Sequence, residues 1–333
     1  MISPSRWLPF EKPLQDIEEQ IQALEAYAAA HGIDRSEKIA ELRVMHADLS
    51  HQIFSNLSAW DKTMMARHPN RPYTLDYIKL IFDDFIELHG DRRFGDDPAI
   101  VAGVARLNGE TVLVIGHQKG RDVKERQFRN FGSARPEGYR KAMRLMELAE
   151  RRHIPVIAFI DTPAAEARLE AEERGISEAI AACMALMSRL RTPIVVSVIG
   201  EGGSGGAIGI AVGDHISMLE HSVYSVIPPE GCAAILDTFG RDGTRGHEAA
   251  CALKITAADN LRMGIIDEVI PEPLGGAHRN AAETAVLLKD TFTRVLAGLH
   301  KLPTDVLLAN RYAKFRALGQ YIDPSAPKKK AKK

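Results

Sequence analysis

The chain has 333 residues, of which 45% are hydrophobic, and this is enough to build a substantial core in one large domain or two ordinary ones. The formal net charge of -1 at pH 7 creates no overall field that would attract nucleic acid or an anionic membrane surface. The sequence shows neither a leader-like apolar stretch near its first residues nor eighteen consecutive apolar residues, so we expect a cytoplasmic protein without a membrane span.

Apolar residues fall at helical spacing from Leu14 to about Trp60 and are interrupted at His31-Gly32. This pattern predicts a helical hairpin, which we assign to residues 1–66. The hairpin either docks a partner subunit or forms a lid on its own domain, because amphipathic spacing alone does not distinguish the two. The turn-rich segment HPNRPYT ends the hairpin, and a further helix is expected over residues 74–89.

Two β-branched runs, AIVAGVARL and TVLVIGHQ, are joined by Asn108-Gly109, which is typical of a tight β-hairpin. Helix and strand patterns then alternate, with helices expected over 136–152, up to 190, from 205, after 280 and after 303, and strands over 154–160, 193–199 and 216–219. The alternation predicts parallel strands with crossover helices, and strands that are apolar on both faces require cover on both sides. We assign this α/β domain to residues 67–322 and predict a disordered, lysine-rich tail over residues 323–333.

The three cysteines, Cys183, Cys232 and Cys251, are far apart and show neither a CxxC motif nor the Cys/His spacing of a zinc site. The sequence therefore predicts no disulfide framework and no metal in this chain. Cys232 follows a predicted helix start and is either an activated thiol or, more commonly for cysteine, a small buried hydrophobe.

The segment IGEGGSGGA, residues 199–207, joins a predicted strand to a predicted helix. The first amides of a helix lack intrahelical partners, the helix dipole adds partial positive charge, and glycine allows a substrate oxygen to approach the main chain. These properties predict an oxyanion site for an enolate or a tetrahedral intermediate. Glycines in such a turn also serve tight turning and close helix packing, so the two interpretations stay open.

The glycine turn also has features of two other kinds of site. A phosphate-binding P-loop requires a lysine after its glycines, and none follows here, so ATP is not expected at this turn. The spacing Gly202-x-Ser204-x-Gly206 also fits the nucleophile elbow of a serine hydrolase, with Asp214 and either His221 or His247 downstream in hydrolase order. The serine hydrolase therefore remains an alternative.

Several strings resemble the alpha subunit of the bacterial acetyl-CoA carboxylase carboxyltransferase family, in the same order from about residue 14 to 321: RHPNRPYTLDYIKLIFDDFIELHGDR, IGHQKGR, NFGSARPEGYRKAMRLMELAE, FIDTP, AEERGISEAIA, VIGEGGSGGA, VYSVIPPEGCA and IPEPLGGAHRN. The resemblance implies a crotonase-like (ClpP/crotonase) spiral of β-β-α repeats. It also implies an obligate, zinc-bearing beta subunit in an alpha2beta2 assembly, together with biotin carboxylase and the biotin carboxyl carrier protein. The implied reaction transfers a carboxyl group from carboxybiotin to acetyl-CoA and forms malonyl-CoA, the first committed step of fatty-acid synthesis.

The reaction develops charge on a biotin ureido oxygen and on a thioester oxygen, so it needs two oxyanion sites. By resemblance, Gly205 and Gly206 serve the biotin side with Gly202 and Gly203 beside them, while the beta subunit holds the enolate. The ureido nitrogen can take the methyl proton, so Glu201 is expected to position groups rather than act as the base. Further substrate-binding candidates are Ser204, Pro163, Ala164, Lys119 and Arg121. The last two either pair with a carboxylate or CoA phosphates or belong to a solvated loop.

The sequence departs from the family after FIDTP, where GAYPG is usual and this chain has residues 164–168, AAEAR. Strong helix formers fill the segment, with Glu170 and Arg174 at i,i+4 spacing, so we expect the helix to begin near Pro163. Such a helix would remove an amide donor and place the charges of Glu166 and Arg168 near the ureido ring.

A smaller departure is Asp237-Thr238, where the family commonly has Trp-Lys. The alternatives are a working subunit with a remodelled pocket, a catalytically weakened structural subunit, and the serine hydrolase.

Overall fold

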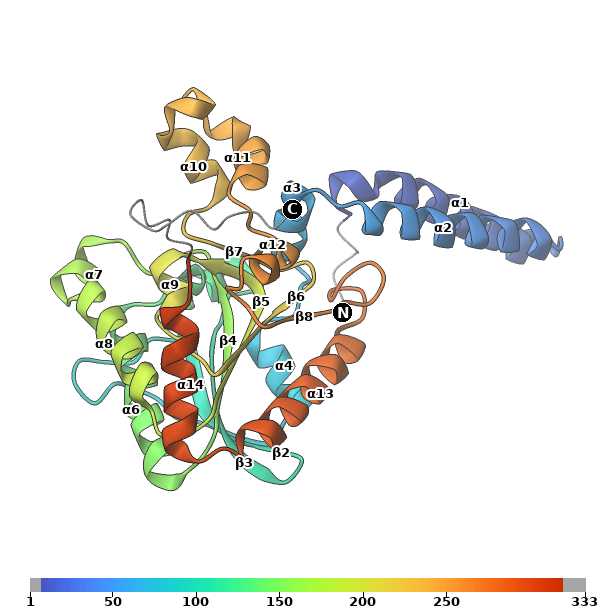
Figure 1. The fold of residues 1–333 in the computed structure, drawn as a ribbon. Helices are drawn as coiled ribbons and strands as arrows, with labels where there is room; N and C mark the ends of the chain where they lie inside the picture. The colour runs from blue at the N-terminus through green and yellow to red at the C-terminus, as the bar shows by residue number, and fades with distance from the viewer. Residues whose placement is uncertain (1–6, 320–333) are drawn as a thin grey trace, which may run out of the picture.

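The computed structural model describes residues 7–319, which form a mixed α/β body and a projecting helical arm (Figure 1). The strands are β1 (Asp83–Glu87), β2 (Ile100–Leu107), β3 (Glu110–His117), β4 (Val156–Thr162), β5 (Ile194–Gly203), β6 (His215–Leu219), β7 (Val223–Ser225) and β8 (Glu268–Ile270). The helices are α1 (Lys12–His31), α2 (Ser36–Ser55), α3 (Ala59–Ala66), α4 (Thr74–Ile81), α5 (Val123–Phe128), α6 (Pro136–Arg152), α7 (Leu169–Glu173), α8 (Ile176–Arg189), α9 (Ser204–Ile208), α10 (Pro229–Ile235), α11 (Gly246–Ala252), α12 (Ala257–Arg262), α13 (Ala281–Leu299) and α14 (Thr304–Arg316). None of the helices between residues 7 and 319 has the length and apolar character that a membrane crossing requires.

The sheet has the strand order β1-β2-β3-β4-β5-β6-β8, and β7 pairs separately with β5. Strands β3, β4, β5, β6 and β8 run parallel, whereas β1, β2 and β3 form an antiparallel meander. Asn108 (φ 51°) and Gly109 (φ 86°) both take the positive φ that a tight hairpin turn requires, so the predicted β2–β3 hairpin is confirmed.

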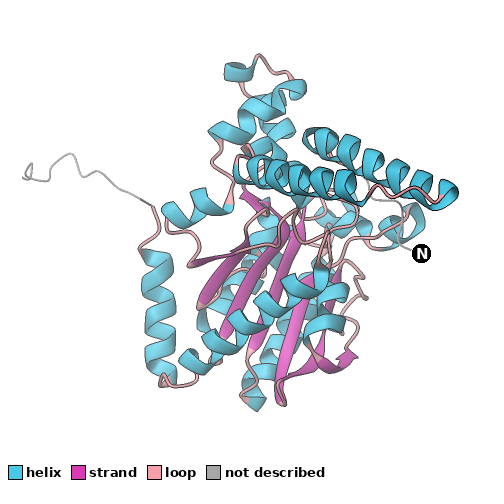
Figure 2. Cartoon of the chain, turned by 90° about the vertical axis from the view of Figure 1, so that its right-hand side faces the viewer, coloured by secondary structure: helices cyan, strands magenta, loops and turns pink. Residues whose placement is uncertain are grey.

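Helices cover both faces of the sheet, as the apolar strands predicted (Figures 1 and 2). On one face, Leu145 of α6 and Met187 of α8 are buried in one cluster with Val156 of β4 and Val196 of β5. On the other face, a second cluster joins α4 and α13 to the sheet and includes Tyr77, Phe159 and Phe292. The central strands are thereby removed from water, and their carboxyl ends meet at one edge of the body.

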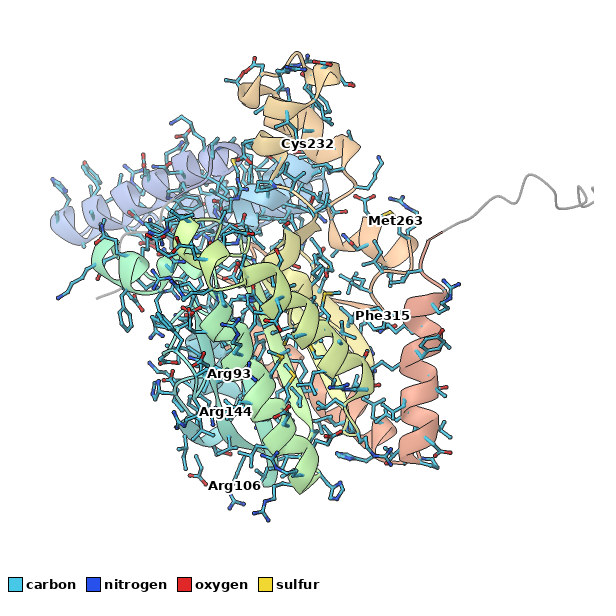
Figure 3. The ribbon with its side chains drawn as sticks, turned by 90° about the vertical axis from the view of Figure 1, so that its left-hand side faces the viewer. Arg93, Arg106, Arg144, Cys232, Met263 and Phe315 are labelled. Carbon is cyan, nitrogen blue, oxygen red and sulfur yellow. The ribbon has the colours of Figure 1, made fainter. Side chains whose placement is uncertain are left out.

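Strand β5 changes partner along its length. Residues Val195–Val198 pair with β6, and the last three residues, Glu201–Gly203, pair with the short strand β7. Beyond β7 the chain continues into a small lobe of α10 and α11, where Cys232 is labelled in Figure 3, whereas Arg106 lies at the far end of the body. Cys232 is 4% exposed and packs against Ala233, Phe239 and Ala249, which confirms the interpretation as a small buried hydrophobe.

The helical hairpin predicted near the start of the chain is present as α1 and α2, which project from the body (Figure 1). The two helices pack through Ile17, Ile21 and Leu42, and the chain turns at Gly32 with φ 64°. The division at residue 66 stays a prediction, and the tail predicted over residues 323–333 lies outside the described residues.

The prediction of a helix over residues 74–89 is wrong for the second half of this range. Helix α4 ends at Ile81, and residues 83–87 form β1, which pairs with β2. Asp84 has a φ of 51°, which interrupts helical geometry, and Gly103 of β2 lets the backbone of Ile86 approach closely. Backbone hydrogen bonding to the exposed edge of β2 therefore determines the conformation of residues 83–87, although their apolar residues have helical spacing.

Candidate functional site

The glycine turn lies where β5 ends and α9 begins. Ser204, the first residue of α9, has a φ of 49°, a strained value for a residue with a side chain. The next two residues are Gly205 and Gly206, and the first amides of a helix lack intrahelical acceptors. The structure therefore confirms the predicted strand-to-helix turn and places two adjacent glycines in the first turn of a short helix.

Packing explains three of the four glycines. A β carbon on Gly203 would lie 1.9 Å from the carbonyl oxygen of Pro163, and one on Gly206 would lie 2.5 Å from the carbonyl carbon of Ala164. A β carbon on Gly202 would lie 2.6 Å from the ring of Tyr224. At Gly205 the nearest atom would be Cδ1 of Ile180 at 3.5 Å, an ordinary contact. Glycine at position 205 is therefore not required by packing, which is consistent with a role in keeping its amide accessible.

The loop after β4 lies directly on the glycine turn, through Pro163 and Ala164. The expectation that a helix begins near Pro163 is wrong, because α7 begins at Leu169. The carboxylate of Glu166 accepts hydrogen bonds from the amides of Ala167 (2.9 Å) and Arg168 (3.0 Å), and its own amide bonds to the carbonyl of Ala134 (2.9 Å). These bonds satisfy the backbone in an irregular conformation and compete with a helix.

The side chains of Glu166 and Arg168 bind each other and Asn130. The hydrogen bond from Arg168, despite the opposing effect of burial, lowers the pKa of Glu166 to about 2, with Asn130 contributing. Arg174 pairs with Glu137 at 2.6 Å, although the helical spacing suggested Glu170 as its partner. The charges of the altered loop are thus engaged with the loop that precedes α6.

A cluster of buried charges lies beside the glycine turn. Lys119, after β3, contacts Asp161 of β4 at 2.7 Å and Glu201 of β5 at 3.0 Å. Glu201 also contacts Arg67, which follows α3, at 2.6 Å, and Arg67 reaches Glu230 at 2.5 Å. Burial alone would raise the pKa of Glu201, but the charges of Lys119 and Arg67 lower it to about 2. Asp161 and Glu201 together hold the pKa of Lys119 well above its usual value, although burial acts to lower it.

A cleft of about 230 Å³ opens above this cluster. It is lined by Ala66, Arg67, Tyr73, Lys119, Gly120, Arg126, Phe131, Pro163 and Glu201. A narrower adjoining hollow shares Arg67, Pro163 and Glu201 with it and is also lined by Gly202 and Gly203. The structure thereby brings five predicted residues, Lys119, Pro163, Glu201, Gly202 and Gly203, to one continuous concave surface.

Arg121 is placed differently from the other predicted residues. Its guanidinium pairs with Asp76, donates to the carbonyls of Pro69 (2.7 Å) and Arg71 (3.0 Å), and lies 4.2 Å from the centre of the Tyr73 ring. Arg121 does not line either hollow, and its contacts tie the loop after β3 to the start of α4. The residues missed from the sequence are Arg67, Asp161, Arg126 and Phe131. Three of them, Arg67, Asp161 and Phe131, stand in the strings that carry the family resemblance, where they begin RHPNRPYT or lie in FIDTP and NFGSARPEGYR.

The glycine turn is supported from below by a buried tyrosine. The hydroxyl of Tyr139 on α6 donates to the carbonyl oxygen of Gly206 at 3.1 Å, and the Tyr139 ring fills the space that a side chain at position 209 would need. His117 is fully buried nearby, and burial lowers the pKa of its imidazole to about 3. The Tyr139 phenol and the His117 imidazole are both uncharged at neutral pH. Neither therefore places a charge next to the glycine amides.

We expect Tyr139→Phe to lower the free energy of unfolding by about 1–3 kcal/mol, because the buried carbonyl of Gly206 loses its side-chain donor. Urea denaturation measures the change. Tyr77→Phe is a matched control, since the Tyr77 hydroxyl is buried without a partner among the described residues, and its removal should be neutral or stabilising. Equal losses in the two variants would contradict a specific role for the Tyr139 hydrogen bond.

The serine hydrolase alternative is contradicted by the positions of its residues. The carboxylate of Asp214 accepts from the amide of Ile194 (2.8 Å) and pairs with Arg311 (2.6 Å). Ile194 is the first residue of β5, whereas Ser204 follows its last, so Asp214 and Ser204 lie at opposite ends of the strand. His221 packs beside Glu272, and His247 is 61% exposed on α11. No triad is assembled around Ser204 by residues 7–319.

Comparison with known proteins gives a match along nearly the whole chain. A family model described as acetyl co-enzyme A carboxylase carboxyltransferase-like matches residues 7–319. The chain is 51% identical over 320 residues to the acetyl-coenzyme A carboxylase carboxyl transferase subunit alpha of Alcanivorax borkumensis, covering 96% of this chain and 98% of that protein. It is 52% identical over 316 residues to the same subunit from Geobacter metallireducens, covering 95% and 98%.

Solved structures with a similar fold include transcarboxylase 12S with methylmalonyl-coenzyme A bound (TM-score 0.52, 20% identity, 67% of this chain and 42% of that chain). The geranyl-CoA carboxylase beta subunit of P. aeruginosa aligns with a TM-score of 0.54 at 15% identity, over 77% of this chain and 46% of that chain. A Pseudomonas malonate decarboxylase chain aligns with a TM-score of 0.54 at 16% identity, over 67% and 90%. These likenesses confirm the predicted crotonase-like α/β fold.

Proposed function

The chain belongs to the acetyl co-enzyme A carboxylase carboxyltransferase family, and we propose that its glycine turn holds the biotin side of the reaction. In this function the chain is the alpha half of an enzyme that transfers a carboxyl group from carboxybiotin to acetyl-CoA and forms malonyl-CoA, which commits carbon to fatty-acid synthesis. The observation that carries the proposal is the pair of adjacent glycine amides at the start of α9, in a chain matched to this family over residues 7–319.

The residues around the turn fit a carboxybiotin substrate. When the carboxyl group leaves the ureido nitrogen, negative charge develops on the ureido oxygen. The amides of Gly205 and Gly206 would donate to that oxygen, and each such donor typically contributes a factor of 10² to 10³ in rate. Pro163 and Ala164 form the facing wall, and Ser204 sets the direction of the amides through its strained backbone.

Glu201 acts as a positioning residue in this proposal. Its carboxylate is bound by Lys119 and Arg67, and its pKa of about 2 makes it a poor proton acceptor at neutral pH. Lys119 is engaged by two acids, so it contributes to the substrate site chiefly by fixing Glu201. Arg121 contributes by holding the adjacent loop.

The relatives are named as alpha subunits, which implies a beta subunit. In this proposal the beta subunit provides the other half of the carboxyltransferase site. We further propose that this subunit carries the zinc and the enolate site, that the assembly is alpha2beta2, and that it works with biotin carboxylase and the biotin carboxyl carrier protein in the cytoplasm. The arm of α1 and α2 is a suitable docking element, because Tyr27, Val44 and Met45 expose 44%, 62% and 56% of their surface. Within residues 7–319 no group of three or more His, Cys, Asp or Glu side chains is arranged to hold a metal ion.

Reconstitution tests the function. The chain alone should form no malonyl-CoA from acetyl-CoA and carboxylated carrier protein, whereas addition of a beta subunit should give turnover. Failure of the complex to turn over would contradict the proposal and would favour the weakened structural subunit, which restoration of GAYPG at residues 164–168 should then activate. The position of the altered loop, which still covers Gly203 and Gly206, favours the working subunit.

A further inference from the structure

Three consecutive residues between α5 and α6 have left-handed backbone conformations. The φ angles are 49° at Asn130, 55° at Phe131 and 81° at Gly132. Glycine adopts such angles freely and asparagine tolerates them, but a bulky aromatic residue does so only under strain. Strained backbone of this kind persists where the surrounding structure holds it, and it concentrates at functional sites.

The surroundings hold this segment through Asn130 and Gly132. The Asn130 amide donates to the carbonyl of Ser133 at 2.5 Å and to Glu166, and its oxygen accepts from Arg168. A β carbon on Gly132 would lie 2.8 Å from Cγ of Lys119, so the backbone is pressed against the buried charge cluster. The segment is thus fixed on one side by the altered loop and on the other by the base of the cleft.

The strain does not serve to bury the Phe131 ring. Phe131 keeps 56% of its surface exposed. Burial of the ring is the only way in which this side chain could stabilise the fold and offset the strain, and the ring is not buried. The exposed ring instead lines the cleft of about 230 Å³, together with Lys119, Pro163 and Glu201. The backbone strain therefore accompanies an exposed aromatic side chain that lines the cleft, and this cleft adjoins the hollow lined by Gly202 and Gly203.

We propose that Phe131 is a binding residue for the biotin ring system, whose fused ureido and thioether rings pack on its aromatic face while the ureido oxygen lies at the turn. This inference rests on the proposed function. A flat, largely uncharged ring with a thioether sulfur is suited to an aromatic surface, through apolar contact and sulfur–aromatic attraction. Asn130, Glu166 and Arg168 are positioning residues, because they hold the conformation that presents the ring.

The test uses the complex of this chain with a beta subunit and follows carboxyl transfer from malonyl-CoA to biocytin, with release of acetyl-CoA. Biocytin presents the biotin ring without a carrier domain, so protein docking does not contribute. Phe131→Gly should raise the KM for biocytin at least tenfold and leave the KM for malonyl-CoA unchanged. Because glycine adopts the left-handed φ without strain, the melting temperature should equal or exceed that of the wild type. Phe131→Trp should retain most of the affinity for biocytin.

Phe128→Ala is the matched control, because Phe128 is 63% exposed on the neighbouring helix α5 and does not line the cleft. It should leave the KM for biocytin unchanged. An unchanged KM for biocytin in Phe131→Gly, an equal rise in Phe128→Ala, or a lower melting temperature in Phe131→Gly would each overturn the inference. Absence of carboxyl transfer in the wild-type complex would instead overturn the proposed function, so the two failures are distinguishable.

Discussion

Gly206→Ala should reduce the kcat for malonyl-CoA formation by about 10³-fold or more. The added β carbon would lie 2.5 Å from both the carbonyl carbon of Ala164 and the amide nitrogen of Ala165, which are backbone atoms that cannot rotate away. The turn and its facing loop must therefore separate, and the amides of the oxyanion site move with them. Loss of one oxyanion donor typically costs a factor of 10² to 10³, and this change disturbs two. Steady-state turnover of the reconstituted complex measures the effect.

Gly205→Ala separates loss of catalysis from loss of folding. Its β carbon meets only Cδ1 of Ile180 at 3.5 Å, so the chain should fold with an unchanged melting temperature. The methyl group nevertheless lies beside the amide that the ureido oxygen must approach, and kcat should fall by about 10². If Gly205→Ala retains full turnover, the amide of Gly205 is not part of the oxyanion site, whatever Gly206→Ala does.

Lys119→Met should lower the free energy of unfolding by about 3–5 kcal/mol, because it leaves Asp161 and Glu201 buried without their shared cation. The pKa of Glu201 in the folded protein is lowered to about 2 from 4.5, so its contribution to stability is complete above pH 4.5 and is lost as the pH falls towards 2. The difference between variant and wild type should therefore be largest near pH 7 and shrink below pH 4.5. Urea denaturation at several pH values measures it.

The double variant Lys119→Met with Asp161→Asn provides the control. It removes one charge of each sign and leaves Glu201 paired with Arg67, so it should recover part of the stability lost in Lys119→Met. A loss below about 1 kcal/mol in the single variant would mean that water reaches the two acids, and the cluster would then not be the rigid base of the cleft.

Much of the fold could be predicted from local patterns. The Asn108-Gly109 turn, the apolar strands β4 and β5, and helix α6 each carry their signal within a few residues. Helix α6 has the predicted bounds, whereas β4 and β5 overlap the predicted strands over 154–160 and 193–199 but extend further, to Thr162 and Gly203. Strand β1 could not be predicted in this way, because its conformation depends on pairing with β2, and residues 83–87 also fit a helical pattern.

The candidate site was predictable only in part. The glycine turn has a local signal, but Arg67 and Glu201 are 134 positions apart, and no spacing rule joins them. The loop of residues 164–168 has helix-forming side chains, yet Glu166 satisfies the local amides and bonds to Asn130, which lies 36 residues earlier. Both the Arg67–Glu201 ion pair and the conformation of residues 164–168 depend on side-chain contacts between segments that are far apart in the sequence.

The change of partner along β5 gives the two halves of this strand different local stability. Residues Val195–Val198 have hydrogen-bonded strands on both sides along their whole length. Residues Glu201–Gly203 pair on one side with the three-residue strand β7, which leads into the lobe of α10 and α11, and on the other side with β4 only at Thr162–Gly202. Segments held by few neighbours open at a lower free energy than the global transition. The glycine turn can therefore open transiently while the centre of the sheet stays closed, and any protein that binds the lobe would slow amide exchange at the turn.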